Sequence, residues 1–443
     1  MRTFFTTEKI TSVISQALLM VFGCISKLFF KSPMATIATL SIYKKHSYKK
    51  AWVMMVMFSL VGQVGFGQAL DDYRAVANGN WNANATWERH NGTTWQAVTG
   101  TAPLTIPNSG DGAINIQNGF TVTVSAAVTA DQLTIEAGGQ ITINASQTLT
   151  IANGTGIDLT VNGTLVRTGT LTLGASATAA VNGTYRHNIN NAALPIATWD
   201  PASTLNVTGV TANALTLNQA FGNIIWNCAA QTVTSQTTVA PFSVAGDFTI
   251  TSTGVVTAGY SAGRMNLAAA ALTMQTGKTF SVGTGASLYL SANANISGPT
   301  FTLASGGTLG IANSAGITAS ANTGNIRTTT RTFNTGANYI YNGTNQSTGN
   351  GLPATVNNLQ FLTSGTKTLT AGVAVTNRIT IATAVVVNQG AFNSSALELN
   401  LASQGAINGS WGSMPASSAT NKSSLFFGAS GAGILNITNS TCV

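Results

Sequence analysis

Residues 120–173 read FTVTVSAAVTADQLTIEAGGQITINASQTLTIANGTGIDLTVNGTLVRTGTLTL, and this stretch decides the fold. Within it, short segments place apolar residues at positions i and i+2 with Thr between them. This period of two is typical of a β-strand with one buried and one solvated face. The segments are Phe120–Val124, Leu133–Ile135, Ile141–Ile143, Leu149–Ile151, Leu159–Val161 and Leu171–Leu173.

Pairs of small turn-forming residues separate these segments. Asn and Gly tolerate the positive φ that tight turns require, so each pair predicts a turn. The pairs are Asn118-Gly119, Gly138-Gly139, Asn153-Gly154, Asn162-Gly163 and Asn182-Gly183. Strand onsets fall about every 8–13 residues, which is the spacing of an all-β chain.

Two all-β architectures fit strands this short: a parallel β-solenoid or tandem β-sandwiches. Sandwich strands are longer and protect their edges with charge, whereas these segments are almost uncharged. We therefore predict a right-handed parallel β-helix (solenoid) over residues 108–400, with tandem β-sandwiches as the alternative. Coils of roughly 20–25 residues give on the order of 15 coils.

The segments that flank the predicted solenoid differ from it in composition. Residues 70–107 contain three tryptophans and two prolines, which predicts an N-terminal cap, because a solenoid must cover its first coil. Residues 401–443 change character again and predict a C-terminal module.

The composition excludes several classes of protein. Only 7% of the 443 residues are charged, against roughly 25% in an average soluble protein. A coiled coil, a salt-bridged helical domain and an acidic disordered tail are thereby excluded. Residues 1–69 hold eight of the 19 Lys and Arg, so the remainder of the chain has no basic cluster, and nucleic acid is not an expected partner.

Beyond the leader the chain has two cysteines, Cys228 and Cys442, which are too few for a disulfide framework. Either one disulfide between them or a buried, unpaired Cys228 fits the sequence.

Residues 1–69 are predicted to be a leader with a signal peptide at 44–69. A Lys-rich segment precedes an apolar run at 51–66, and Gly67 and Ala69 supply small residues at −3 and −1. Cleavage after Ala69 predicts a protein that is secreted or at the cell surface, with no membrane span in the mature chain. An uncleaved anchor is the alternative. A misassigned start codon would explain residues 1–33, and a real extra membrane-associated helix is the other explanation.

Short motifs in the chain resemble modules of large Bacteroidetes surface proteins. The motifs are Asn80-Trp81, Ala85–Trp87, Ile106–Asp111, Val181–His187, Ala197–Trp199, Tyr339–Gly343, Thr348–Pro353, Val356–Leu359, Asn408–Gly412 and Ala419–Lys422. The resemblance implies a secreted, adhesin-like β-solenoid, and many such proteins leave through the type IX system by a C-terminal sorting domain. No sorting domain is recognisable before Val443, which a truncated reading frame would explain. The resemblance supplies no catalytic residue.

Residues able to do chemistry are few and scattered beyond the leader. Glu88-Arg89-His90 is interpreted as a solvated loop of the cap, and Arg186-His187 as a turn after a strand. Asp71-Asp72 is expected to be a mobile end, and Asp111 a turn residue without a calcium site. The sequence therefore predicts no catalytic residue, metal site or cofactor, and a protein that is not an enzyme.

Three non-catalytic functions fit these features, and an enzyme is a further alternative. We predict a structural or adhesin-like rod whose partners are extracellular glycans or surface components. A glycan-binding module and a carbohydrate-active β-helix enzyme are alternatives, the former with Trp81, Trp87 and Trp95 as stacking platforms. An ice- or crystal-binding face is the third function, suggested by Thr pairs that share an outward face: Thr121/Thr123, Thr148/Thr150, Thr170/Thr172 and Thr368/Thr370.

Overall fold

The computed structural model describes residues 68–237, 243–257, 259–268, 271–382 and 384–388. It also describes five short strands further on: β38 (Leu397–Leu399), β39 (Gly405–Ile407), β40 (Ser410–Trp411), β41 (Leu425–Phe427) and β42 (Leu435–Ile437). The predicted signal peptide at 44–69 lies almost wholly outside these residues, as does most of the predicted module at 401–443. Within the described residues, no helix is long and apolar enough to cross a membrane.

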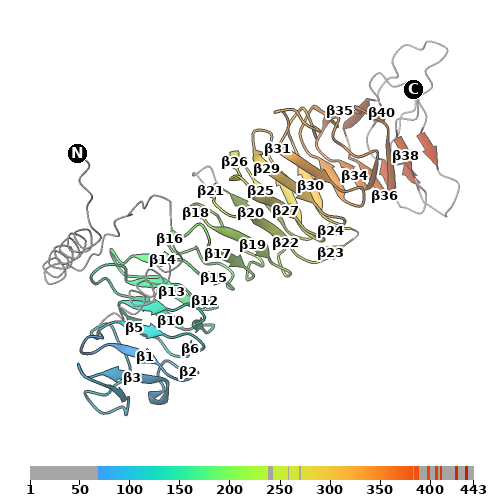
Figure 1. Ribbon diagram of the computed structural model, residues 1–443. Coiled ribbons are helices and arrows are strands. Elements are labelled where there is room, and N and C mark those ends of the chain that lie inside the picture. Colours follow the sequence, from blue (N-terminus) through green and yellow to red (C-terminus); the bar gives the residue numbers. More distant parts are fainter. Residues whose placement is uncertain are drawn as a thin grey trace, which may run out of the picture. The chain divides into compact units, whose positions relative to one another are not determined.

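Residues 114–388 form a parallel β-solenoid of about 13 turns (Figure 1). Each early turn has three strands, one on each of three faces. The first turn is β5 (Ile114–Ile116), β6 (Thr121–Val124) and β7 (Val128–Ala130); the second is β8 (Leu133–Ile135), β9 (Gln140–Ile143) and β10 (Thr148–Ile151); the third is β11 (Leu159–Val161), β12 (Thr164–Arg167) and β13 (Thr170–Leu173). The predicted parallel β-solenoid is confirmed, and the tandem-sandwich alternative is wrong. The right-handed sense of the solenoid stays a prediction.

Later turns continue these faces. The first face adds β14 (Ala179–Val181) and β16 (Thr198–Trp199), then a separate pair, β18 (Ala220–Phe221) and β21 (Ser243–Val244). The second face adds β15 (Thr184–His187), β17 (Thr204–Val207), β19 (Asn223–Asn227), β22 (Phe248–Ser252), β27 (Thr279–Val282), β29 (Asn295–Leu303), β31 (Ile326–Phe333) and, paired with the start of β29, β26 (Ala271–Thr273). A separate sheet holds β20 (Thr234–Thr237), β25 (Arg264–Leu267), β28 (Ser287–Leu290), β30 (Thr308–Ile311), β32 (Asn338–Tyr341), β34 (Thr355–Phe361) and β36 (Val373–Ile381); another holds β33 (Gln346–Ser347), β35 (Gly365–Thr368) and β37 (Val385–Asn388).

An extension of mixed strand direction precedes the first turn, within the predicted cap at 70–107. It contains β1 (Tyr73–Ala75), β2 (Gly79–Asn80), a 3-10 turn at Asn84–Thr86, β3 (Trp87–His90) and β4 (Trp95–Ala97). Strand β1 pairs in parallel with β5 and antiparallel with β3, which pairs with β4. The solenoid sheet therefore continues into the cap without a free edge at β5.

Inward-facing side chains stack into columns that form the core. One column on the second face begins with Val122, Ile141, Leu165, Tyr185 and Leu205, all buried. It continues through Ile224, Phe248, Phe280 and Phe301. Burying each such side chain stabilises the fold by about 1.5–3 kcal/mol.

An inserted hairpin interrupts the regular length of the turns. Thr164, Thr184 and Thr204 pair in series, a step of 20 residues for each turn. Phe248 instead pairs with Phe280, because a hairpin of β23 (Val256–Thr257) and β24 (Tyr260–Ser261) is inserted between them.

The β23–β24 hairpin reaches along the solenoid over later turns. The Gly259 carbonyl accepts a hydrogen bond of 2.7 Å from Asn338 Nδ2 in β32, a residue 79 positions further on. Ser261 Oγ lies 2.5 Å from Ser287 Oγ in β28. Asn358 Nδ2 in the next turn donates to Asn338 Oδ1 at 2.7 Å, so the hairpin ends on a buried amide ladder.

At one corner of the solenoid, glycine is required because neighbouring backbone atoms are too close for a side chain, and not because the residue has a positive φ. Gly119 has φ of +85° as predicted, whereas Gly163 and Gly183 are not among the positive-φ residues. A Cβ on Gly163 would lie 2.2 Å from the Gly139 carbonyl oxygen, and one on Gly183 would lie 2.2 Å from that of Gly163. The predicted turns are correct here, but their glycines are needed because the carbonyl of the preceding turn leaves no room for a side chain.

Replacing Gly163 by Ala is expected to lower the free energy of unfolding by about 2–3 kcal/mol, since both nearest atoms are backbone oxygens that cannot move independently. Gly119→Ala is the matched control. Its Cβ would meet nothing within 4 Å, so only the backbone strain of about 1 kcal/mol applies. Urea unfolding of both variants measures the difference, and equal losses would contradict the close-packing explanation.

Candidate functional site

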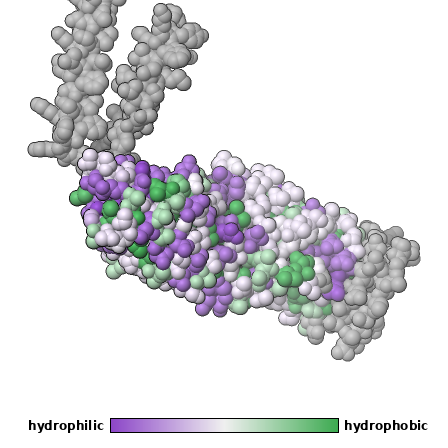
Figure 2. Space-filling view, turned by 90° about the horizontal axis from the view of Figure 1, so that it is seen from below, coloured by the Kyte–Doolittle hydropathy of each residue, from purple (hydrophilic) through white to green (hydrophobic). Residues whose placement is uncertain are grey.

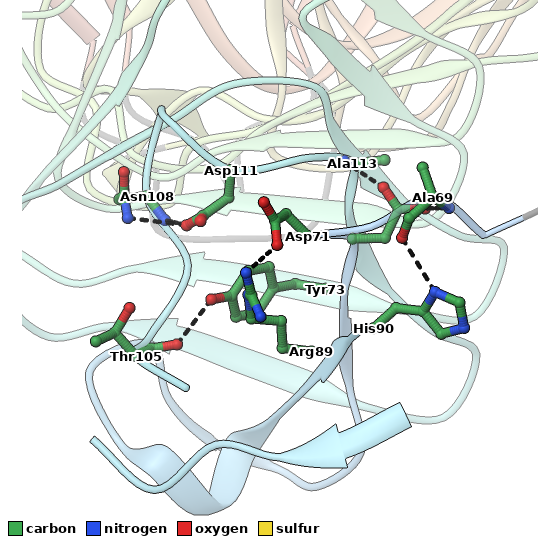
Figure 3. Close-up of polar contacts among 10 residues, drawn as sticks. Ala69, Asp71, Tyr73, Arg89, His90, Thr105, Asn108, Asp111 and Ala113 are labelled. Carbon is green, nitrogen blue, oxygen red and sulfur yellow. Dashed lines mark hydrogen bonds and ion pairs between the residues drawn. The ribbon is translucent and has the colours of Figure 1, made fainter. Parts of the chain in front are cut away.

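The densest group of charges lies in the cap, where ion pairs and hydrogen bonds hold it, and Figure 3 shows those of Arg89, His90 and Asp111. Arg74 Nη2 lies 2.5 Å from Glu88 Oε2, and Arg89 pairs with Asp71. His90 is buried, and its Nδ1 lies 3.1 Å from the Ala69 carbonyl oxygen. The prediction of a solvated loop at Glu88-Arg89-His90 is therefore wrong: these residues form β3, which is held between β1 and β4.

The neighbouring aspartates are held equally firmly. Asp72 accepts hydrogen bonds from Ala113 N at 2.9 Å and from Ala69 N at 2.7 Å, so the prediction of a mobile end is wrong. Asp111 Oδ2 accepts from both nitrogens of Asn108, at 2.7 and 2.8 Å, which confirms the predicted turn. Burial raises the pKa of Asp111.

All four acidic side chains of this group have polar partners. Asp71 and Glu88 pair with arginines, Asp72 accepts from backbone nitrogens, and Asp111 accepts from the backbone and side-chain nitrogens of Asn108. Among the described residues, no three His, Cys, Asp or Glu side chains gather where they could hold a metal ion.

The three predicted stacking tryptophans lie in different environments. Trp81 and Trp87 are buried edge to face in the cap core, and their Nε1 atoms donate to the carbonyls of Pro107 and Trp81. Trp95 is partly exposed, with the Arg74 guanidinium 4.4 Å from its ring centroid. Glycan stacking stays a prediction, and only Trp95 offers a ring for it without rearrangement of the cap.

A second candidate site lies where strand pairing on the third face is interrupted. The sheet of β7, β10 and β13 ends at β13, and in the next two turns residues 188–197 and 208–219 form no strand. A groove of about 650 Å³ opens between β13 and residues 193–198. We call it the third-face groove; its lining includes Arg167, Leu171, Leu173, Leu194, Pro195 and Ile196.

Side chains, and not strand pairing, hold the far wall of this groove. Arg167 Nη1 donates to the Ala193 carbonyl at 2.6 Å. From the following turn, Gln219 accepts from Ala197 N at 3.0 Å and donates to the Pro195 carbonyl at 3.0 Å. Residues 193–197 are thus fixed from both sides while no backbone hydrogen bond joins them to β13.

Two polar side chains occupy inward positions beside the groove. Arg167 and His187 follow Val124 and Ile143 in one core column, and Val207 follows them. Arg167 is only 6% exposed and also contacts the Tyr185 hydroxyl at 3.4 Å. The prediction of a turn at Arg186-His187 is wrong, because both residues belong to β15 and only Arg186 points outward.

His187 is a neutral core residue. Neither ring nitrogen has a hydrogen-bond partner, and the ring stacks on Tyr185 with centroids 6.4 Å apart. Burial, followed by the nearby Arg167 charge, lowers the pKa of His187 to about 3. Burial also raises the pKa of Tyr185 to about 12, so both groups stay uncharged near neutral pH.

One signal in the sequence could have located this groove. Thr164-Leu-Val-Arg167 follows the alternation that places its fourth residue inward, so Arg167 breaks the apolar rule at a core position. Cys228, by contrast, is buried as one of the two interpretations expected, and Cys442 lies outside the described residues.

The low pKa of His187 makes the fold sensitive to acid. In the unfolded chain the ring binds a proton below its ordinary pKa of 6.5, whereas the folded chain resists protonation down to about 3. Stability is therefore lost as pH falls, by roughly 2–3 kcal/mol between pH 7 and 4.5.

His187→Leu is expected to remove that share of the acid sensitivity and to stabilise the protein at pH 7 by about 1–2 kcal/mol, because two unpartnered buried nitrogens disappear. Urea unfolding at pH 7, 5.5 and 4.5 measures both effects against the unsubstituted chain. Parallel pH dependence of the two proteins would contradict a neutral buried His187.

No family model, curated protein or solved structure matches the chain. Its place among β-solenoids rests on the strand pairing described above, and the resemblance to Bacteroidetes surface proteins stays a prediction.

Proposed function

We propose that this chain is a non-catalytic, exported structural or adhesin-like protein that presents a repetitive β-solenoid surface. The observation that carries the proposal is the stacking of outward Thr side chains in register. Thr129, Thr150 and Thr172 pair in three successive turns of the third face. Thr164, Thr184 and Thr204 do the same on the second face.

Such rows suit weak contacts repeated many times. Paired strands lie about 4.8 Å apart, so each row repeats a hydroxyl at that interval along the solenoid. On the face drawn in Figure 2, hydrophilic and weakly polar residues are interspersed with small apolar patches. An uncharged surface of this kind fits neutral extracellular glycans, and many weak contacts raise avidity without one strong site.

Two further observations support export and the absence of catalysis. The compact unit begins at Gln68, within two residues of the predicted cleavage site after Ala69. In the cap, the carboxylates of Asp71, Asp72, Glu88 and Asp111 are bound to arginine or backbone nitrogens, which leaves no pair of free carboxylates there for glycoside chemistry.

Binding of a regular solid surface such as ice is a second candidate. Thr148 and Thr150 pair with Thr170 and Thr172, so two adjacent Thr rows share one face. Thermal hysteresis of the full chain tests this candidate, and its absence would remove it.

The adhesin-like proposal predicts that retention on chitin and cellulose particles rises more steeply than linearly with the density of the full chain on beads. A gain of about 100-fold or more over the free protein is expected from avidity. Retention no greater than that of albumin-coated beads would overturn the proposal, and release of soluble sugar would indicate an enzyme.

A matched pair of variants identifies the surface responsible. Thr129→Lys, Thr150→Lys and Thr172→Lys together place three charges in one row and are expected to reduce bead retention. Thr93→Lys with Thr94→Lys adds charge at exposed positions of the cap and is expected to leave retention unchanged.

A further inference from the structure

We propose that the third-face groove binds an extended peptide, which adds as a strand to the free edge of β13 and places a carboxylate on Arg167. This inference is independent of the adhesin-like function, since it concerns a single site where the repeat is broken.

The backbone of β13 offers unpaired groups at this edge. In a parallel strand the N–H and C=O of successive residues point alternately to the two neighbouring strands. Thr170 N and Gly174 N donate to Gln147 and Ile151 on the β10 side. The N–H and C=O groups of Leu171 and Leu173 therefore point into the groove, where no strand pairs with β13. These groups form the template for an added strand.

The third-face groove has the length of a short peptide strand and not of a long one. β14 and β15 continue the first and second faces through the same turn, so the interruption has the length of one strand. The volume of about 650 Å³ falls within the range of 300–1,000 Å³ typical of ligand clefts. Leu171, Leu173 and Leu194 line it, which favours apolar side chains at alternate positions of the peptide.

The charge of Arg167 specifies one polar contact. Arg167 is a basic residue and is only 6% exposed, yet it forms no salt bridge in the described part of the chain. Its partners are the Gly169 and Ala193 carbonyls and the Tyr185 hydroxyl, which engage Nε and Nη1. Nη2 takes part in none of these bonds, and Arg167 lines the groove at the end where β13 begins. A carboxylate there would complete the pairing, so we expect an acidic residue at the start of a parallel peptide.

The probe is the peptide acetyl-Asp-Thr-Leu-Thr-Leu-amide, whose last four residues repeat β13 and whose Asp aligns beside Gly169. Titrated into the isotopically labelled full chain, it is expected to bind saturably below roughly 1 mM and to shift the amide signals of Leu171 and Leu173. No saturable binding in that range would overturn the proposal.

Two altered peptides separate the two contacts. N-methylation of the peptide nitrogens that face β13 is expected to abolish binding, because the added strand then lacks its donors. Replacing Asp by Asn is expected to weaken binding about tenfold and to remove its salt dependence. Full binding of the N-methylated peptide would overturn strand addition, and equal binding of the Asn peptide would overturn the role of Arg167.

A matched pair of protein variants locates the site. Ile196 lines the groove and is 69% exposed, so Ile196→Asp is expected to weaken binding about tenfold without affecting the core. Ile157 is 52% exposed and does not line the groove, and Ile157→Asp is expected to leave binding unchanged. Equal effects of the two substitutions would overturn the placement, as would a neutral oligosaccharide that competes for the same shifts.

Discussion

In-register parallel hydrogen bonding between successive turns is the constraint on which the rest of the structure depends. It makes each residue the neighbour of its counterparts about 4.8 Å above and below. A charged residue repeated in one column would therefore face its own charge at that distance, which costs roughly 1 kcal/mol per pair even in water. Thr and Asn carry no such penalty, and Asn182 Nδ2 donates to Asn162 Oδ1 at 2.8 Å. A low charged fraction suits this geometry, and 7% of the whole chain is charged.

The same constraint determines how buried cations are accommodated. Arg167 and Lys367 both lie inside the solenoid without a carboxylate and donate to peptide carbonyls. Lys367 Nζ bonds the carbonyls of Gly343, Thr344 and Thr363, all in turns, and burial lowers its pKa. Corners of the coil leave carbonyls without strand partners, so a long cationic side chain satisfies several at once. Arg167 differs from Lys367 because it lines the third-face groove, where strand pairing is interrupted.

The strands could be predicted because their period of two is local, whereas the sites depend on turn length. The alternation of Leu149 and Ile151 correctly identifies the buried face of β10. His187 was expected in a turn, because nothing in its neighbours reveals that β15 pairs with β12. Glu88 and Arg89 were expected in a solvated loop, since their ion pairs come from residues 14 and 18 positions away. The groove has only an indirect signal in the sequence, namely Arg167 at an inward position, because the missing strand itself leaves no pattern.

The β23–β24 hairpin also has a mechanical consequence. A simple stack of turns unravels from its end one turn at a time, because each turn contacts only its neighbours. The bond from Asn338 Nδ2 to the Gly259 carbonyl instead joins turns that are not adjacent in the stack, since β28 and β30 lie between β25 and β32. Tension along the axis must therefore break this hydrogen bond before the turns between β25 and β32 can separate. These turns would then unfold together and not one at a time.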